Sequence, residues 1–368
     1  MGAALTVPLE VQIAHKLADF TLDVNFVAAD EPLSVLGPSG AGKSMLLRCI
    51  AGLERAGRGR IVLNGRTLLD SEKKIHLPAR ERRVGMLFQH YGLFPHRTLA
   101  ENIAFGIRQL PLGQRGSRVA SLVERAHLSG LENRYPREVS GGEQQRAALA
   151  RALAIEPEAL LLDEPLSALD AHLRSQMEAE LQSAFDRYAR PSLLVTHNVE
   201  EAYRLGKRLL VLSRGRIAAF GDKDEIFLRP PSLEVARLTG CKNFSRVRLI
   251  DPHCIEAIDW HCRVRVAKVP NAAPAYVGIR AHHVRFVDAD ERGAQAENAF
   301  PCWLVRASQT PFRVTLYLRL IPPTKSTEKK DEFDLQVEVT RERWARLRDQ
   351  PEPFRVMLPP DALFLVSE

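Results

Sequence analysis

Residues 37–44 read Gly-Pro-Ser-Gly-Ala-Gly-Lys-Ser, and this stretch decides the fold of the chain around it. It is a complete phosphate-binding loop of the form G-x-x-x-x-G-K-[ST]. The apolar stretch 33–36 before it indicates a buried strand, and apolar residues recur at helical spacing over 45–50. A strand, a glycine-rich loop and a helix start in this order predict a site for the phosphates of a nucleoside triphosphate.

The loop supplies the predicted phosphate contacts. Its glycines let the backbone approach an anion closely, and the N–H groups at the helix start favour negative charge. Lys43 is expected to reach the β- and γ-phosphates, and the Ser44 hydroxyl to ligate Mg²⁺. The predicted set is Gly37, Pro38, Ser39, Gly40, Ala41, Gly42, Lys43 and Ser44. The alternative, a glycine-rich turn before an ordinary helix, agrees less well with this spacing and context.

The composition fits a globular chain of more than one domain. With 368 residues, 45% of them hydrophobic and 26% charged, the chain can form two or three domains with their own cores. No apolar run approaches the roughly 18 residues that a membrane-spanning helix needs. We therefore expect a cytosolic protein whose role at a membrane, if it has one, requires a partner.

The net charge of +7 raises the question of a nucleic-acid partner. Much of the excess is dispersed, and no aromatic interleaving or nucleic-acid motif accompanies it. One denser basic cluster comprises Lys73, Lys74, Arg80, Arg82 and Arg83. We interpret this cluster as a solvated face, or one near anionic lipid headgroups, and expect no nucleic-acid partner.

The five cysteines form no C-x-x-C pair and are odd in number, which favours reduced, structural thiols. The alternative is a metal site among the later cysteines and the histidines near them, although no ligand spacing matches a zinc pattern. These later cysteines are Cys241, Cys254, Cys262 and Cys302.

Periodicity outlines the rest of the first domain. Residues 9–27 alternate and predict two antiparallel strands, whereas 95–136 has helical periods that indicate a helical insertion. Buried strands are predicted at 84–89, 159–164 and 192–197, and each ends in a polar residue. A strand that ends in this way can bring the polar side chain to the phosphate site.

A break in composition at Pro230-Pro231 precedes the second domain. Beyond about residue 240 the chain alternates as strands do, in 261–269, 313–321, 333–339 and 362–366. A small all-β, barrel-like (OB-like) domain is the economical interpretation. We predict one domain over 1–235, with a helical subdomain at about 92–150, and a C-terminal β domain over 236–368.

Two adjacent carboxylates follow the apolar run at 159–162. Asp163 can meet the Mg²⁺ held by Ser44, which leaves Glu164 as the candidate general base for water attacking the γ-phosphate. Gln89 can contact Mg²⁺ or that water, and His197 can hydrogen-bond the γ-phosphate. Taken alone, a strand-end glutamine is usually solvated and a strand-end histidine usually structural.

Residues Ser140, Gly141 and Gly142 form a second anion-binding stretch at a predicted helix start. One chain does not need two such stretches for one triphosphate. Two chains arranged head to tail would place each stretch over the phosphate loop of the other.

In this order the motifs resemble those of an ABC-transporter ATPase. They are similar to its Walker A, Q-loop, signature, Walker B, D-loop and switch histidine, here 37–44, Gln89, 139–144, 162–165, 167–170 and His197. The likeness covers about residues 9–230. It implies an α/β P-loop NTPase core with antiparallel β and helical subdomains, ATP and Mg²⁺ as cofactors, Glu164 as catalytic base and Asp170 at a dimer interface.

Two positions depart from the family pattern. Glu143 stands in the signature where glutamine is common, which is a mild change. The aromatic residue that usually stacks on adenine is not evident, and His15 or Phe20 could serve.

Within the family the chain is similar to importer ATPases that carry a C-terminal β regulatory domain. Stretches 59–66, 82–90 and 93–96 resemble the molybdate importer's ATPase in particular, with the sulfate, tungstate and ferric-iron importers as close relatives. This resemblance implies molybdate as the cargo, with sulfate, tungstate or ferric iron as the alternative. The resemblance implies a homodimer bound to integral-membrane permease subunits at the cytoplasmic face of the inner membrane, served indirectly by a substrate-binding protein. The alternatives are a soluble ABC ATPase acting on nucleic acid or ribosomes, and a regulatory ATP binder that does not hydrolyse.

The same resemblance suggests two further surfaces. The helical stretch 95–136 would dock the permease, with Tyr91, Leu93 and Phe94 lining the groove, although each could equally be core packing. Residues 278–283, which include Arg280, offer donors for a cargo oxyanion in the second domain, although a solvent-facing turn is equally compatible.

Overall fold

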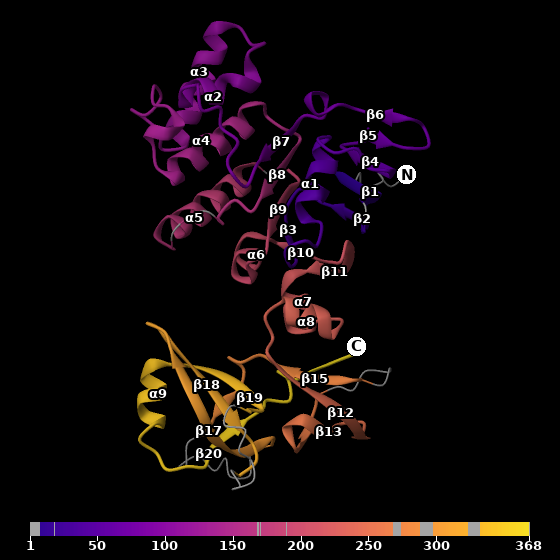
Figure 1. Ribbon diagram of the computed structural model, residues 1–368, viewed down its shortest axis with the longest axis vertical. Coiled ribbons are helices and arrows are strands. Elements are labelled where there is room, and N and C mark those ends of the chain that lie inside the picture. The colour runs from indigo at the N-terminus through magenta and orange to yellow at the C-terminus, as the bar shows by residue number, and fades with distance from the viewer. Residues whose placement is uncertain are drawn as a thin grey trace, which may run out of the picture. The chain divides into compact units, whose positions relative to one another are not determined.

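The computed structural model describes residues 8–17, 19–167, 169, 171–188, 190–267, 274–287, 297–322 and 332–367. The chain separates into two compact units, Met1–Lys223 and Asp224–Glu368 (Figure 1). The domain boundary predicted from the sequence, between 235 and 236, lies somewhat further along the chain.

In the described part of the first unit, one sheet of eleven strands has the order β6-β5-β4-β1-β2-β11-β10-β3-β9-β8-β7. The strands are β1 (Leu9–Leu17), β2 (Phe20–Ala28), β3 (Pro32–Leu36), β4 (Arg58–Leu63), β5 (Arg66–Asp70), β6 (Ile75–His76), β7 (Val84–Leu87), β8 (Ala159–Asp163), β9 (Ser192–Thr196), β10 (Arg208–Ser213) and β11 (Arg216–Asp222). Strands β7, β8, β9, β3 and β10 run parallel, whereas β2, β1, β4, β5 and β6 pair antiparallel. The predicted antiparallel pair over 9–27 is confirmed.

The helices of this unit are α1 (Lys43–Ala51), α2 (Leu99–Ala104), α3 (Leu112–Arg125), α4 (Gly141–Ala154), α5 (Ala171–Tyr188) and α6 (Val199–Leu205). Helices α2, α3 and α4 are grouped at one end of the unit in Figure 1, and they share one apolar cluster. The predicted helical stretch 95–136 contains α2 and α3. Helix α7 (Lys223–Leu228) follows β11.

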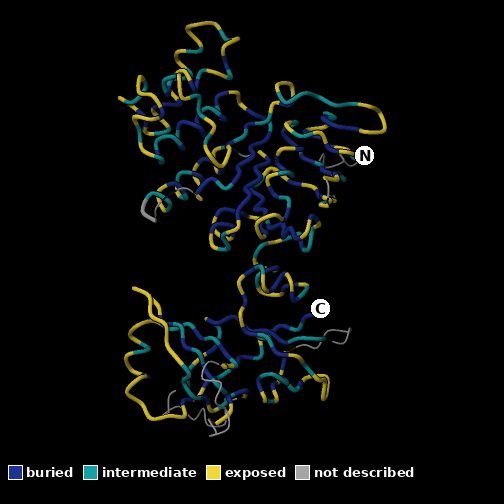
Figure 2. Tube along the Cα trace, viewed as in Figure 1, coloured by how far each residue is buried: buried dark blue, intermediate teal, exposed yellow. Residues whose placement is uncertain are grey.

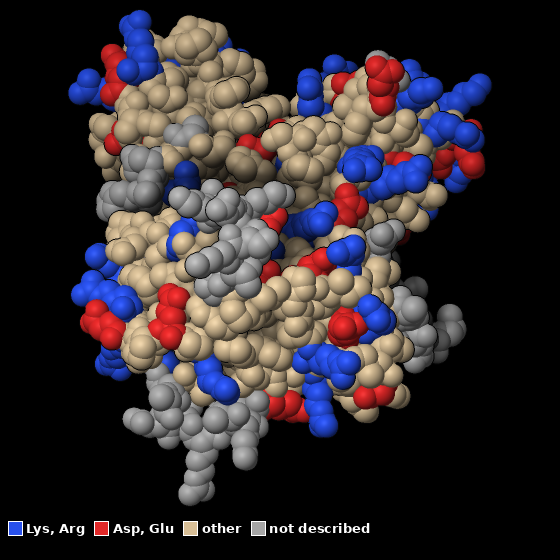
Figure 3. Space-filling model, turned by 60° about the horizontal axis from the view of Figure 1, so that its bottom comes forward, with Lys and Arg blue, Asp and Glu red and all other residues tan. Residues whose placement is uncertain are grey.

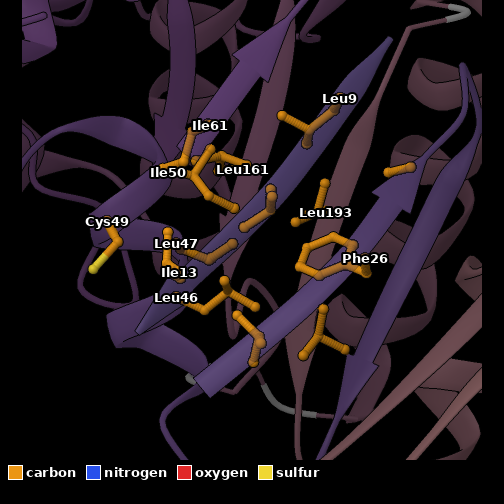
Figure 4. Close-up of a cluster of buried hydrophobic side chains, with 14 of the residues drawn as sticks. Leu9, Ile13, Phe26, Leu46, Leu47, Cys49, Ile50, Ile61, Leu161 and Leu193 are labelled. Atoms are coloured by element: carbon orange, nitrogen blue, oxygen red, sulfur yellow. The ribbon is translucent and has the colours of Figure 1, made fainter. Parts of the chain in front are cut away.

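The central parallel strands are covered on both faces. Every residue of β3, β8 and β9 is buried, as expected for a parallel sheet between helix layers (Figure 2). Leu161 and Leu193 pack in one cluster with α1 (Figure 4), whereas Leu160, Leu162 and Leu194 pack in another with α4 and α5. Because these strands are parallel, their carboxyl ends lie at one edge of the sheet, where the loops that carry the polar motif residues begin.

Arg82 is a correction to the predicted basic face. Its side chain is fully buried rather than solvated. The guanidinium donates hydrogen bonds of 2.8 Å each to the carbonyls of Leu77, Cys49 and Ile50. The last two carbonyls belong to the final turn of α1, where a cation is also favoured by the helix dipole.

Gly52 makes room for this arginine. It ends α1 with φ 77°, and a Cβ at this position would lie 2.5 Å from Arg82 Nε. Arg82 therefore caps the C-terminus of α1, the helix whose N-terminus follows the phosphate loop.

On the face shown in Figure 3, the exposed basic side chains are interspersed with acidic ones.

The described part of the second unit contains two five-stranded sheets, of orders β14-β13-β12-β15-β21 and β16-β20-β17-β18-β19. The strands are β12 (Asn243–Asp251), β13 (Cys254–Ala257), β14 (Cys262–Arg265), β15 (Tyr276–Ile279), β16 (Arg285–Phe286), β17 (Ala299–Gln309), β18 (Arg313–Arg319), β19 (Leu335–Thr340), β20 (Phe354–Met357) and β21 (Phe364–Val366). Both sheets contribute to one core around Trp260. The expected barrel-like β domain is confirmed, with two short helices, α8 (Leu233–Leu238) and α9 (Arg341–Leu347), that the sequence pattern did not predict.

All five cysteines are free thiols. Burial raises the pKa of Cys262 and of Cys302 to about 12. Among the residues that the structure describes, no three His, Cys, Asp or Glu side chains converge as a metal site would require, and no helix is long and apolar enough to span a membrane.

Candidate functional site

The phosphate loop connects β3 to α1, and two of its glycines are required by sterics. A Cβ on Gly37 would lie 2.2 Å from the carbonyl oxygen of Leu212 in β10, closer than real atoms approach. Gly42 is the N-cap of α1 with φ 100°, and a Cβ there would lie 2.8 Å from Phe20 Cζ. Only glycine fits both positions, so the loop can lie tightly against β10 and Phe20.

Lys43 is the first residue of α1 and is almost wholly buried. Its Nζ donates to the carbonyls of Gly37 at 2.8 Å and Pro38 at 3.0 Å, so the ammonium group closes the loop upon itself. Burial lowers the pKa of Lys43, and the nearby carboxylates of Glu164 and Asp163 oppose that shift. The loop thus holds a cation whose present partners are weak carbonyl acceptors.

Ser44 and Asp163 meet across the gap between α1 and the end of β8. The Ser44 hydroxyl donates to Asp163 Oδ1 at 2.8 Å. Burial raises the pKa of Asp163, and the hydrogen bond from Ser44 partly offsets this. A hydroxyl and a buried carboxylate side by side are hard oxygen ligands of the kind that Mg²⁺ selects, so the donor set fits that ion.

Glu164 lies at the centre of the polar cluster. Its Oε1 is 3.0 Å from His197 Nδ1, and Gln89 Nε2 donates to its Oε2 at 3.4 Å. The Glu164 backbone is left-handed, with φ 45°, and its N–H donates to the carbonyl of Val195 in β9. The β8–β9 pairing therefore brings Glu164 and His197 together although 33 residues separate them.

Strained, non-glycine backbone of this kind is uncommon and is held by its surroundings. Here the carbonyl of Glu164 also accepts hydrogen bonds from the backbone N–H and the hydroxyl of Ser167. The Glu164 backbone is thus held by three hydrogen bonds, while the carboxylate itself contacts His197 and Gln89.

The structure modifies the prediction for Ser140. Ser140 is the N-cap of α4 and forms a capping box with Glu143. Its N–H and hydroxyl donate to Glu143 Oε2 at 2.7 and 2.9 Å, and these contacts lower the pKa of Glu143. The helix start is therefore already partnered by its own carboxylate, and a phosphate would have to compete with Glu143 for the Ser140 hydroxyl.

The remaining predicted residues have different surroundings. Asp170 lies outside the described residues. His15 is buried on the inward face of β1, with Nε2 3.8 Å from Glu54 Oε1, so it is poorly placed to stack on a base. Phe20, which contacts the loop at Gly42, is the better aromatic candidate.

The groove residues differ in their packing. Leu93 packs against two core clusters, in agreement with the alternative of core packing. Phe94 lies with its ring centroid 4.4 Å from that of Phe105 and 5.6 Å from the guanidinium of Arg151. Phe105 is 39% exposed, so the Phe94–Phe105 pair keeps an open apolar edge.

The suggested oxyanion site at 278–283 is not available in this structure. Arg280 is buried, and its guanidinium donates to the carbonyls of Phe227 and Thr239 and to the Thr239 hydroxyl. Gly278 lies against the ring of Phe364, where a Cβ would lie 2.5 Å away. Arg280 therefore ties α7 and α8 to β15, and its donors are used within the fold.

Comparison with known proteins decides the family. A family model described as "ABC transporter" matches residues 21–167. The sulfate/thiosulfate import ATP-binding protein CysA 2 of Rhizobium meliloti is 40% identical over 282 residues, which cover 74% of this chain and 73% of that protein. The chain belongs to the ABC transporter ATP-binding proteins.

Further comparisons also match this chain to ABC proteins. The sulfate/thiosulfate import ATP-binding protein CysA of Synechocystis sp. is 44% identical over 225 residues, and this chain spans 62% of its length. A component of the cbiONQ ABC transporter complex from Clostridium perfringens superposes with a TM-score of 0.54 at 26% identity, over 60% of this chain and 90% of that one. A dimeric ATP-binding cassette bound to ADP and Pi gives a TM-score of 0.51 at 27% identity, over 58% and 98%.

The predicted P-loop NTPase fold and the predicted membership of the ABC ATP-binding family are thereby confirmed. For the cargo, the relatives named above are sulfate/thiosulfate import ATP-binding proteins. They favour the alternative prediction, which comprised sulfate, tungstate and ferric iron, over molybdate. No sequence motif pointed to Thr196, Glu201 and Arg174. These residues lie around the end of β9, next to His197.

Proposed function

We propose that this chain is the ATP-hydrolysing subunit of an ABC importer, with Glu164 as the general base. The observation that carries the proposal is the position of the Glu164 carboxylate, between His197 and Gln89 and one residue after Asp163. A general base must lie within hydrogen-bond reach of the water that it activates, in a cluster that also holds the phosphate-binding groups.

The chain's own residues account for the chemistry. Lys43 Nζ exchanges its carbonyl partners for oxygens of the β- and γ-phosphates, which are stronger acceptors. Ser44 and Asp163 would hold Mg²⁺, which when bound neutralises charge on the phosphates. Water attacks the γ-phosphorus, a new P–O bond forms, the bond to the β–γ bridging oxygen breaks, and Glu164 accepts the proton of the water. The products are ADP and inorganic phosphate.

His197 orients this base. When Nδ1 carries the proton it donates to Glu164 Oε1, and only the imidazolium form would have a second N–H, on Nε2, for the γ-phosphate. Gln89 contacts the other carboxylate oxygen, so movement of the segment after β7 changes the hydrogen bonding of the base directly. This contact supports the idea that Gln89 reports permease docking to the site.

The second half of the site would come from another copy of the chain. The first turn of α4, with Gly141 and Gly142, would face the γ-phosphate bound by the partner's loop. Head-to-tail pairing is supported by the related cassettes whose solved structures are dimeric. Asp170, by resemblance, would lie at this interface.

Import requires a membrane partner. The open edge of Phe94 and Phe105, in the part of the chain that follows Gln89, is the surface on which a permease segment would dock. We place the assembly of two ATPase subunits and the permease at the cytoplasmic face of the cell membrane, with this chain peripheral to it. A substrate-binding protein on the other side would deliver the cargo.

Sulfate or thiosulfate is the proposed cargo, because the relatives compared above import these anions. The test is uptake of labelled sulfate and labelled molybdate by a deletion strain that carries the wild-type chain or Glu164→Gln. Uptake of sulfate that depends on Glu164, without uptake of molybdate, is expected. Molybdate uptake without sulfate uptake would overturn the cargo assignment and leave the ATPase proposal in place.

A further inference from the structure

A buried polar network lies directly behind His197. Thr196 is the last residue of β9 and is 1% exposed. Its hydroxyl donates to Glu201 Oε2 at 2.7 Å and accepts from the backbone N–H of Asn198 at 3.0 Å. These two contacts fix the backbone on both sides of His197.

Glu201 is an unusual residue for this position. It lies in the first two turns of α6, where Asn198 caps the helix through the N–H groups of Glu200 and Glu201. The Glu201 side chain is only 7% exposed, so its charge is largely removed from water. A buried carboxylate is costly unless it is paired and hydrogen-bonded.

The pairing comes from α5. Arg174 Nε lies 3.9 Å from Glu201 Oε1, and Arg174 also donates to the carbonyl of Leu169 at 3.0 Å. Arg174 therefore joins Glu201 to the segment that immediately precedes α5. Burial raises the pKa of the Glu201 carboxyl, and the Thr196 hydroxyl and Arg174 oppose that shift from its two oxygens.

The same strand end is also bonded to Glu164, the proposed general base. Glu164 N–H donates to the carbonyl of Val195, and the Glu164 carboxylate meets the imidazole of His197. Rotation of the strand end at 196–198 would therefore move the imidazole relative to the base. An error of about 1 Å in such a position is enough to cost on the order of 100-fold in rate.

We propose that Glu201 is a positioning residue for ATP hydrolysis, which holds His197 against Glu164 through the hydroxyl of Thr196. Glu201 acts on His197 through the hydroxyl of Thr196 and the backbone of Asn198. This inference rests on the proposed function, since it assumes that Glu164 and His197 act on ATP.

The test compares matched variants of the full-length chain by steady-state ATP hydrolysis. Thr196→Val keeps the shape of the side chain and removes its hydroxyl, whereas Thr196→Ser keeps the hydroxyl. We expect Thr196→Val to lower kcat by about tenfold with an unchanged KM for ATP, and Thr196→Ser to stay within about twofold of wild type. Equal kcat values for the two variants would overturn the proposal.

Glu201 is tested in the same assay. Glu201→Leu removes the acceptor and is expected to lower kcat as Thr196→Val does, whereas Glu201→Gln retains an acceptor oxygen and should recover most of the rate. Because Thr196→Val and Glu201→Leu break the same contact, the double variant should be no slower than either single one. Losses that multiply would contradict the proposal.

Two controls keep the outcomes distinct. Thermal unfolding of each variant shows whether a loss of kcat reflects loss of the fold, in which case nucleotide binding would fall as well. Glu164→Gln is measured alongside. If wild type hydrolyses ATP and Glu164→Gln does not, the proposed function stands whatever Thr196→Val does; if wild type shows no hydrolysis, the proposed function itself fails.

Discussion

The replacement Arg82→Met tests whether the hydrogen bonds from Arg82 to the C-terminus of α1 contribute to stability. Methionine keeps the length and the apolar stem of the side chain and removes every donor. The carbonyls of Leu77 and Ile50 lose their partner at a site with no access to water, whereas the Cys49 carbonyl keeps the hydrogen bond that it accepts from the backbone N–H of Gly52 at 3.3 Å. A buried acceptor left without a partner costs about 1 kcal/mol or more.

The sum of two such losses, partly offset because a buried charge is also removed, gives about 2 kcal/mol in the free energy of unfolding. For a unit of this size about 2–4 °C of Tm correspond to 1 kcal/mol, so the Tm of the first unit should fall by about 4–8 °C. Scanning calorimetry of the full-length chain measures this fall.

The adjacent arginine is a matched control. Arg83 is 71% exposed and pairs with Glu158 at 3.3 Å, so Arg83→Met should cost less than about 1 kcal/mol. The reasoning is refuted if Arg82→Met and Arg83→Met unfold at the same temperature. Arg82→Lys should remain destabilised, because one ammonium group cannot satisfy three carbonyls from the position of a planar fork.

Three further outcomes follow from the geometry. Gly37→Ala should abolish binding of a fluorescent ATP analogue in a folded chain, because its Cβ would lie 2.2 Å from a backbone oxygen. Gly40→Ala meets no atom within 4 Å and bears only the strain of its left-handed backbone, φ 79°, which costs about 1–2 kcal/mol, so it should still bind the analogue more weakly than wild type; equal binding by both variants would contradict the steric argument. Lys43→Ala should weaken nucleotide binding and Ser140→Arg should block ATP-driven dimerisation, while a mixture of the two should recover some hydrolysis through one intact composite site; unchanged dimerisation of Ser140→Arg would exclude head-to-tail pairing. Cys302, with a pKa of about 12, should resist alkylation at pH 8 in the folded chain, where only about one thiol in 10⁴ is ionised, and react once urea unfolds it; rapid labelling of the native protein would show that it is not buried.

The parts of the site that could be predicted are those written in short, contiguous motifs. The loop 37–44 specifies its own conformation through glycines, a lysine and a serine, and the apolar run before Asp163 specifies a buried strand. Parallel strands end at the same edge of a sheet, so Asp163 and His197 were bound to approach the loop once their strands were identified. The helical stretch before α4 was recognised by its period.

Charged residues were the main source of error, because hydropathy treats every arginine as solvated. Arg82 and Arg280 are buried since each finds carbonyl acceptors that are distant in sequence: Arg82 reaches Cys49, and Arg280 reaches Phe227. Neither partner could be identified without the tertiary fold. The Arg280 contacts also removed the suggested oxyanion site, which had assumed free donors.

Other features carried a signal that was not used. Ser140 followed three residues later by Glu143 is the sequence signature of a capping box, so the partnered state of this helix start was open to prediction. The contact of Thr196 with Glu201 carried no such signal, because it requires a strand, a turn and a helix at a particular angle. The motifs held no information on the cargo, since the proposed site acts on ATP and not on a transported anion.

The proposed ATP hydrolysis requires Glu164 as the general base in an ATP-bound dimer. The most direct measurement is ATP hydrolysis by Glu164→Gln, with its oligomeric state followed by size exclusion in the presence of ATP and Mg²⁺. Glutamine keeps the shape and the contact with His197 but cannot accept the proton, so hydrolysis should fall by at least about 100-fold while ATP binding persists and a stable dimer accumulates. Hydrolysis near the wild-type rate would contradict the assignment of Glu164.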